Sequence, residues 1–121
     1  MVKVRIGDKE YGLRLDLDAV EKIQDEFGDM GDAVNKMKKS NVKAIRTLFK
    51  IMANSALAFE GKEETVTGEE LKKLKIAAMP GISKAFERAI EDGMRSETTG
   101  GAEADDEVYD VYLAEIEEKN G

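Results

Sequence analysis

The stretch Val2–Gly28, VKVRIGDKEYGLRLDLDAVEKIQDEFG, changes its hydrophobic period part of the way along. In its first half, apolar residues alternate with charged or polar ones on both sides of a Gly-Asp-Lys turn, which predicts a β-hairpin with one apolar face. In its second half the spacing becomes helical. Asp16 is a good N-cap for that helix, and Gly28 suits a left-handed stop at its end. The apolar residues expected on the inner face of the helix are Leu17, Val20, Ile23 and Phe27.

Two registers of the hairpin fit this pattern. A two-residue loop at Asp8-Lys9 pairs Ile6 with Tyr11, Val4 with Leu13 and Val2 with Leu15, and it places all six apolar residues on one face. A loop at Gly7-Asp8 keeps the same residues on that face, so the pattern does not choose between the two. An isolated hairpin is only marginally stable in water, so we expect helices to cover its apolar face.

Helical spacing continues through most of the following chain. A short helix is expected over 32–39, and Ser40-Asn41 should end it and start the next. A capping box at 67–70 and the single proline, Pro80, mark two further helix starts. The longest stripe, which predicts the central helix, is Val42, Ile45, Phe49, Met52, Ala56 and Phe59. We therefore predict an α+β fold over residues 1–96, in which the N-terminal hairpin packs on a mainly helical domain of four to five helices.

The end of the chain has a different composition. Residues 97–106 are small, polar and glycine-containing, which predicts a flexible linker, and residues 107–121 form an acidic segment with apolar residues at helical spacing. We expect this segment to be an amphipathic helix that either completes the core or docks in a groove of a partner or of its own body. The candidate partner-binding residues on it are Tyr109, Tyr112, Leu113 and Ile116.

Charge is distributed unevenly along the 121 residues, whose net charge is -7. Residues 1–96 hold 17 acidic and 18 basic side chains, whereas residues 97–121 hold 9 acidic and 1 basic. Residues 33–59 contain six basic side chains and no acidic one. On a helix, the basic residues of 36–50 would form a stripe, in which we name as further candidates for partner binding Lys39, Lys43, Arg46 and Lys50.

This basic stripe has two interpretations besides a solvated face. It could bind phosphates, but no aromatic residue interleaves with the lysines and the whole chain is acidic, so we do not expect nucleic acid as a partner. Alternatively, the acidic end of the chain could fold back onto the stripe.

The composition also limits which catalytic and metal-binding groups the chain can supply. The chain has no His and no Cys, so imidazole and thiolate groups are unavailable for catalysis or metal binding. Its paired carboxylates lack the spacing of an EF-hand, and its glycines form no phosphate-binding loop. We therefore expect no catalytic, cofactor-binding or metal site. No apolar stretch is long enough to span a membrane and no signal-peptide core follows the start, so the expected compartment is the cytoplasm.

The opening stretch resembles the start of phage tail assembly chaperones from long-tailed phages and prophages of Gram-positive bacteria. In that family a short hairpin with a Gly-Lys-Glu-Tyr-like turn leads into an "LEKIEEEFG"-like helix, which here is similar to AVEKIQDEFG at 19–28. The ending DVYLAEIEEKNG, at 110–121, resembles the acidic amphipathic end of those proteins, and a VTGEEL helix start, at 66–71, matches their layout.

The resemblance implies a protein without enzymatic activity. Such chaperones bind the long helical tape-measure protein and keep it soluble until tail-tube subunits polymerise around it. They act in the cytoplasm of the host bacterium and are absent from the mature virion. The implied partners are the tape-measure protein and, secondarily, the tail-tube protein, and the sequence is compatible with a homo-oligomer. The alternative prediction is a small acidic regulatory or nucleic-acid-associated adaptor that uses the basic stripe at 36–50.

Overall fold

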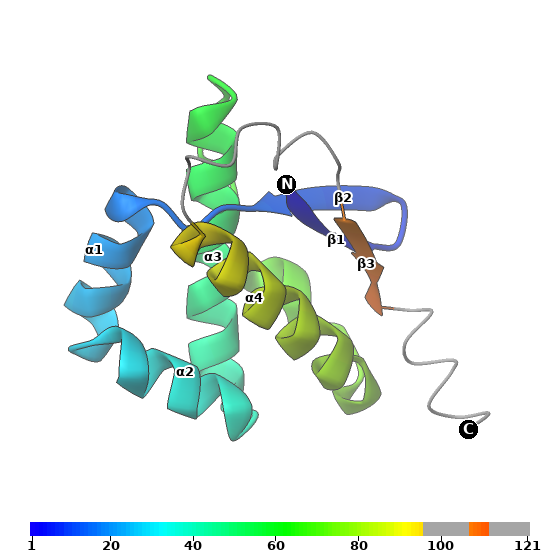
Figure 1. Cartoon of the computed structure of the whole chain (residues 1–121). Helices are drawn as coiled ribbons and strands as arrows, with labels where there is room; N and C mark the ends of the chain where they lie inside the picture. Colours follow the sequence, from blue (N-terminus) through cyan, green and yellow to red (C-terminus); the bar gives the residue numbers. More distant parts are fainter. Residues whose placement is uncertain (96–106, 112–121) are drawn as a thin grey trace.

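The computed structural model describes residues 1–95 and 107–111, which form a three-stranded sheet and four α-helices (Figure 1). The predicted α+β class is therefore confirmed for this part of the chain. The helices α1 and α2 lie on one side of the long helix α3, and the sheet lies on the other side, with α4 crossing in front. The elements are β1 (Val2–Ile6), β2 (Lys9–Leu13), α1 (Leu17–Phe27), α2 (Met30–Lys38), α3 (Val42–Phe59), α4 (Met79–Met94) and β3 (Glu107–Asp110).

The hairpin adopts one of its two candidate registers. β1 and β2 pair antiparallel with Ile6 opposite Lys9, so the two-residue loop is Gly7-Asp8. Gly7 has a φ of 68°, and the first position of a tight hairpin loop requires such a positive φ, which glycine adopts without steric cost. In this register Val4 faces Tyr11 and Val2 faces Leu13. The apolar face of the hairpin is retained, as both registers predicted.

The third strand corrects our prediction of a helix at the start of the acidic segment. Glu107–Asp110 is a strand that pairs parallel with β1, so the sheet order is β2-β1-β3. The free edge of β1 offers backbone groups to this stretch, and sheet pairing overrides its local helical spacing. Val108 and Tyr109 also favour a strand, since one is β-branched and the other aromatic. The linker predicted at 97–106 and the rest of the predicted helix, 112–121, lie outside the described residues.

Side-chain caps start the first three helices, and those of α1 and α3 agree with the sequence. The helix α2, which we expected from residue 32, begins two residues earlier, at Met30. Asp16 accepts a hydrogen bond from the N–H of Ala19 at 2.9 Å, and Asn41 accepts one from Ala44 at 3.0 Å. Asp29 caps α2 in the same way. Gly28 ends α1 with a φ of 93°, and Ser40, with a φ of 58°, separates α2 from α3. The predicted break at Ser40-Asn41 is therefore confirmed, and it divides the basic stripe between two helices.

The helix α3 is the centre of the core, as its long stripe predicted. Its buried residues include Ile45, Phe49, Met52 and Ala56, and α1, α2 and β2 pack against it. The two ends of the stripe were predicted wrongly, since Val42 is 55% exposed and Phe59 is 57% exposed. These residues lie in the first and last turns of α3, which extend past the elements that pack on it. The prediction that Leu17 faces inward is also wrong, because this residue lies in the first turn of α1 and is 88% exposed.

The predicted helix after the capping box is absent. Residues 67–78 form two short 3-10 turns, Glu69–Leu71 and Ile76–Ala78, although the N–H of Thr67 does donate to Glu70 at 3.2 Å. Contacts with α3 keep this segment irregular. The Asn54 side chain bonds both the N–H and the carbonyl of Val66, at 2.9 and 2.8 Å. Val66, Leu71 and Ala78 are buried in the core. Their burial determines the path of the backbone over this segment and overrides its helical spacing.

Candidate partner-binding site

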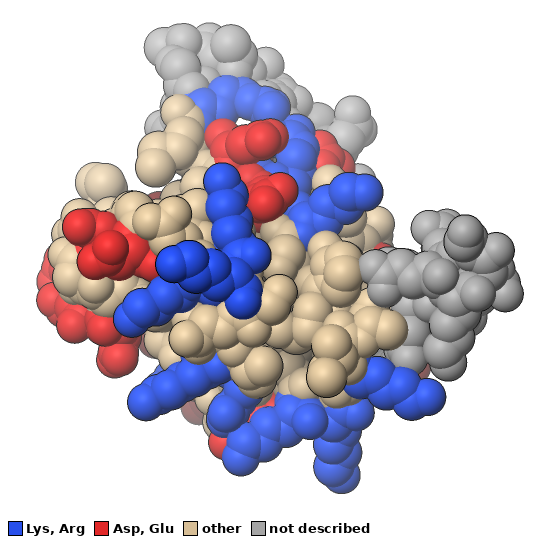
Figure 2. Space-filling view, turned by 90° about the horizontal axis from the view of Figure 1, so that it is seen from below, with Lys and Arg blue, Asp and Glu red and all other residues tan. Residues whose placement is uncertain are grey.

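A groove of about 680 Å³ lies between α1, α3 and the segment that precedes the first 3-10 turn. Charged side chains of both signs surround it, with Thr47, Ile51, Asn54 and Thr67 between them. Figure 2 shows the molecule from below, where Lys and Arg side chains gather across the visible face and acidic ones concentrate at the edge formed by α1 and α2. The charged residues that line the groove are Lys22, Asp25, Glu26, Lys43, Arg46, Lys50 and Glu64.

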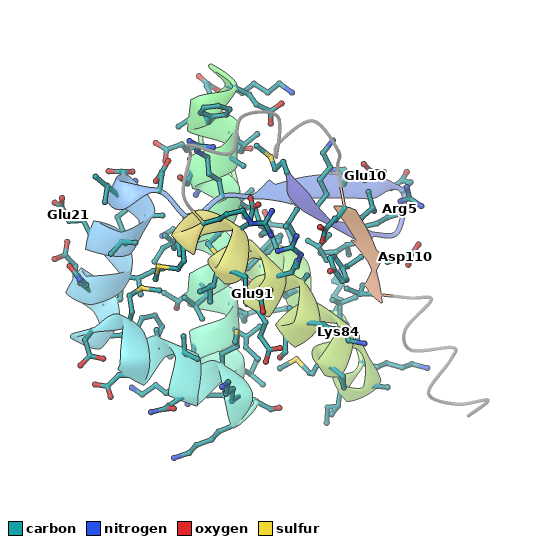
Figure 3. The ribbon with its side chains drawn as sticks, viewed as in Figure 1. Arg5, Glu10, Glu21, Lys84, Glu91 and Asp110 are labelled. Carbon is teal, nitrogen blue, oxygen red and sulfur yellow. The ribbon has the colours of Figure 1, made fainter. Side chains whose placement is uncertain are left out.

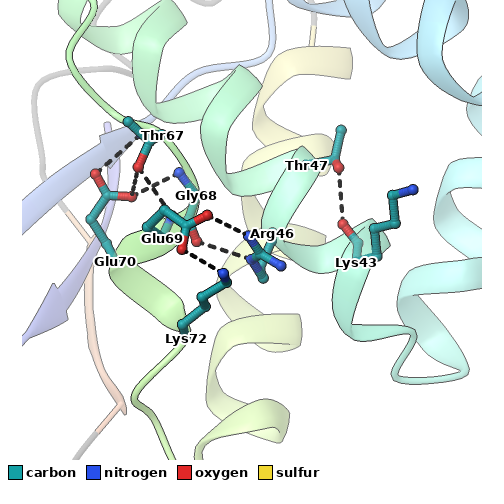
Figure 4. A network of polar contacts seen from close by, with 8 residues as sticks. All are labelled: Lys43, Arg46, Thr47, Thr67, Gly68, Glu69, Glu70 and Lys72. Atoms are coloured by element: carbon teal, nitrogen blue, oxygen red, sulfur yellow. Dashed lines mark hydrogen bonds and ion pairs between the residues drawn. The ribbon is translucent and has the colours of Figure 1, made fainter.

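Arg46 anchors one wall of the groove (Figure 4). Its guanidinium donates to the carbonyl of Gly68 at 3.3 Å and pairs with Glu69 at 2.9 Å, and Lys72 pairs with the same carboxylate at 2.8 Å. Lys72 and then Arg46 lower the pKa of the Glu69 carboxyl, against the opposing effect of burial. Gly68 has a φ of 91°, and a Cβ there would lie 3.0 Å from the Arg46 carbonyl oxygen. The side chain of Arg46 is therefore occupied in holding the chain against α3.

Lys22 is similarly engaged on the opposite wall. Its ammonium lies 3.0 Å from Asp18, one turn earlier in α1, and 3.5 Å from Glu64. The hydrogen bond that Lys22 donates to Asp18, with a smaller contribution from Glu64, raises the pKa of Lys22 against the opposing effect of burial. Lys22 thus connects α1 to the segment that carries Glu64, and both of these charges are satisfied within the protein.

Four other charges of the groove remain unpaired within the described residues. Neither Lys43 nor Lys50 on α3 forms an ion pair there, and the same holds for Asp25 and Glu26 on α1. All four are exposed. The groove is therefore polarised: it has free ammonium groups along α3 and free carboxylates along α1.

Three of these free charges lie at the helix end where their sign is unfavourable. Asp25 and Glu26 are in the last turn of α1, which contains no basic residue. Lys43 is in the first turn of α3, which contains no acidic residue. The partial charge of a helix is positive at its N-terminus and negative at its C-terminus, so these side chains destabilise their own helices.

Three of the basic residues predicted as partner-binding candidates are brought together here. Lys43, Arg46 and Lys50 line the groove, whereas Lys39 is the exposed C-cap residue of α2 and does not line it. The acidic wall of the groove was not predicted from the sequence. The signal was present, because Asp25 and Glu26 directly precede the Phe27-Gly28 helix end, where basic residues are the favourable choice.

Of the C-terminal candidates, Tyr109 lies in β3 and packs half-buried against the core, while Tyr112, Leu113 and Ile116 lie outside the described residues. Arg88 of α4 holds β3 through three hydrogen bonds to Glu107, at 2.7, 2.8 and 3.1 Å. The Tyr109 hydroxyl donates to the same carboxylate at 3.2 Å. The described part of the acidic segment therefore docks on β1 and α4, and not on the basic stripe.

Arg5 adds a second charged contact at this edge of the sheet. It pairs with Glu10 of β2 at 2.6 Å and lies 3.8 Å from Asp110 of β3, so one guanidinium connects all three strands (Figure 3).

The attachment of β3 should weaken in acid. Hydrogen bonding from Arg88, and less strongly from Tyr109, lowers the pKa of Glu107 below its ordinary value of 4.5, although burial opposes this. A carboxyl with a lowered pKa stabilises the folded state fully above its unfolded pKa, and that contribution is lost as the pH falls through the folded value. We expect the NMR signals of Val111 to shift toward those of a detached strand below about pH 4.5. The variant Glu107→Gln should lack this acid step, and identical titrations of both proteins would contradict the assignment.

In comparisons with known proteins, no family model, no curated protein and no solved structure matched this chain. Two further findings concern the described residues alone. None of their helices is long and apolar enough to cross a membrane, and no group of three or more of their acidic side chains is placed to hold a metal ion.

Proposed function

We propose that this protein is a non-enzymatic phage tail assembly chaperone, which binds the tape-measure protein and keeps it soluble until the tail tube polymerises. It acts in the cytoplasm of the host bacterium and is absent from the mature virion. The observation that carries the proposal is the polarised groove between α1 and α3. The resemblance of Val2–Gly28 to the opening of those chaperones supports it independently.

A groove between helices suits a helical partner. An amphipathic helix binds such a groove by placing its apolar face on the floor and its charged flanks against the rims. Here the lining includes Ile51 and Thr47, and both α1 and α3 contribute charges that are unpaired among the described residues. A long helical protein with charges of both signs on its surface would supply many segments that fit.

Co-expression tests this function. The chain would be produced together with the tape-measure protein of the same phage or prophage, and the soluble fraction would be purified through a tag on the chain. We expect the tape-measure protein to move from the insoluble to the soluble fraction and to co-purify. An unrelated acidic protein of similar size serves as the control. Equal solubility of the tape-measure protein with the chain and with the control would contradict the proposal.

A second candidate function is a small acidic regulatory or nucleic-acid-associated adaptor that uses the basic stripe. The unpaired ammonium groups of Lys43 and Lys50 favour it, because free cations on one helix face can contact phosphates. Such binding would weaken steeply with salt. Titration of labelled DNA and RNA with the protein at low and physiological salt distinguishes the two functions, since a chaperone should bind neither measurably.

A further inference from the structure

We infer that the groove between α1 and α3 recognises an amphipathic helix whose two flanks carry opposite charges. Its acidic flank lies against Lys43 and Lys50 on α3, and its basic flank lies against Asp25 and Glu26 on α1. The inference rests on the proposed function only in naming the source of the helix, a segment of the tape-measure protein. The charges of the groove themselves specify the pattern of charge on the helix that binds.

The spacing of the free cations on α3 matches a helical ligand. Lys43 and Lys50 are seven residues apart, so they lie on the same face of α3, roughly 10 Å apart along its axis. Arg46 lies between them but is already bonded to Gly68 and Glu69. A partner helix that runs along α3 meets both free ammonium groups if it carries carboxylates about two turns apart on one flank.

The opposite wall excludes ligands of a single charge. Asp25 and Glu26 line the same groove, so a phosphate-rich ligand or a uniformly acidic segment would meet repulsion from α1. A uniformly basic segment would meet the same repulsion from α3. A helix with segregated charges is attracted by both walls at once, and it can enter in only one direction.

The placement of these charges at helix ends supports a binding role. Glu26 in the last turn of α1 and Lys43 in the first turn of α3 are unfavourable for the helices that carry them. Exchanging the two signs would improve both helix ends. These residues are therefore poor choices for stability alone, and an oppositely charged partner would compensate them.

A charge exchange within the groove separates binding from folding. The double variant Lys43→Glu, Glu26→Lys keeps the net charge of -7 but removes the segregation of charge in the groove, because each wall then carries one acidic and one basic side chain. We expect its thermal midpoint to equal or exceed that of the wild type, because both helix ends become favourable. We expect its affinity for the tape-measure protein, measured by titration calorimetry, to fall at least about tenfold, because each flank of the bound helix then meets one repulsive charge in place of an attractive one.

The matched control is Lys84→Glu, Glu21→Lys, which also preserves net charge. Both residues are exposed, lie outside the groove lining and are labelled in Figure 3. The control variant should bind the tape-measure protein with the affinity of the wild type. If the groove variant binds the tape-measure protein as tightly as the control, the groove inference is overturned while the proposed function stands.

A second probe tests the groove without the tape-measure protein. Two synthetic helical peptides of identical composition would be compared, one with Glu on one flank and Lys on the other, and one with the same charges intermixed. The wild type should bind the segregated peptide at least about tenfold more tightly. Equal or absent binding of both peptides overturns the groove inference. Failure of the wild type to bind the tape-measure protein overturns the proposed function, whatever the peptides show.

Discussion

Replacing Phe49 with alanine should lower the free energy of unfolding by about 3–5 kcal/mol. Phe49 lies in the middle of α3, is fully buried and meets the ring of Tyr11 edge to face, with ring centroids 5.2 Å apart. Truncation removes this contact and leaves a cavity where the sheet meets the helices, which the surrounding structure fills only in part. A loss of this size is a large share of the roughly 5–15 kcal/mol that stabilises a typical domain.

The matched control for this variant is Phe59→Ala, which makes the same change in the last turn of the same helix. Phe59 is 57% exposed and lies under the Arg14 guanidinium, whose carbon is 3.7 Å from the ring centroid. We expect its removal to cost about 1 kcal/mol or less. Urea unfolding, monitored by circular dichroism, measures the free energy of unfolding of both variants. Equal effects of the two substitutions would contradict the placement of α3 at the centre of the core.

Replacing Val111 with aspartate should detach β3 from the sheet. Val111 directly follows this strand and is fully buried, and an aspartate there would have to lose its hydration without a partner. We expect the docking of 107–111 to weaken by roughly 3 kcal/mol or more, because apolar burial is lost and a charge must be desolvated. Undocking returns the carboxylate to water, so the helical body should remain folded while amide exchange of β3 and β1 accelerates.

The control for this second variant lies three residues earlier on the same strand. Val108 is 42% exposed, so Val108→Asp introduces the same charge without burying it. Amide exchange of 107–111 should then stay close to that of the wild type. Rapid exchange in both variants, or in neither, would contradict the parallel pairing of β3 with β1.

Only part of the candidate site could be predicted from the sequence. The basic wall was visible in the sequence, because Lys43, Arg46 and Lys50 recur at helical spacing in a stretch without acidic residues. Which of these cations is free could not be predicted. Arg46 is bonded to Gly68 and Glu69, more than twenty residues away along the chain, and only the folded chain brings those groups within reach. The acidic wall depends in the same way on the packing of α1 against α3.

Local sequence patterns predicted the structure correctly wherever the stabilising interactions are themselves local. The hairpin, the caps at Asp16 and Asn41 and the break at Ser40 follow from turn and capping chemistry within a few residues. Tertiary contacts decided the rest. The segment after Thr67 has helical spacing but follows α3 as two 3-10 turns, and Glu107–Asp110 has helical spacing but completes a sheet. In both places the burial and backbone pairing offered by distant elements outweigh a local preference of a few tenths of a kcal/mol per residue.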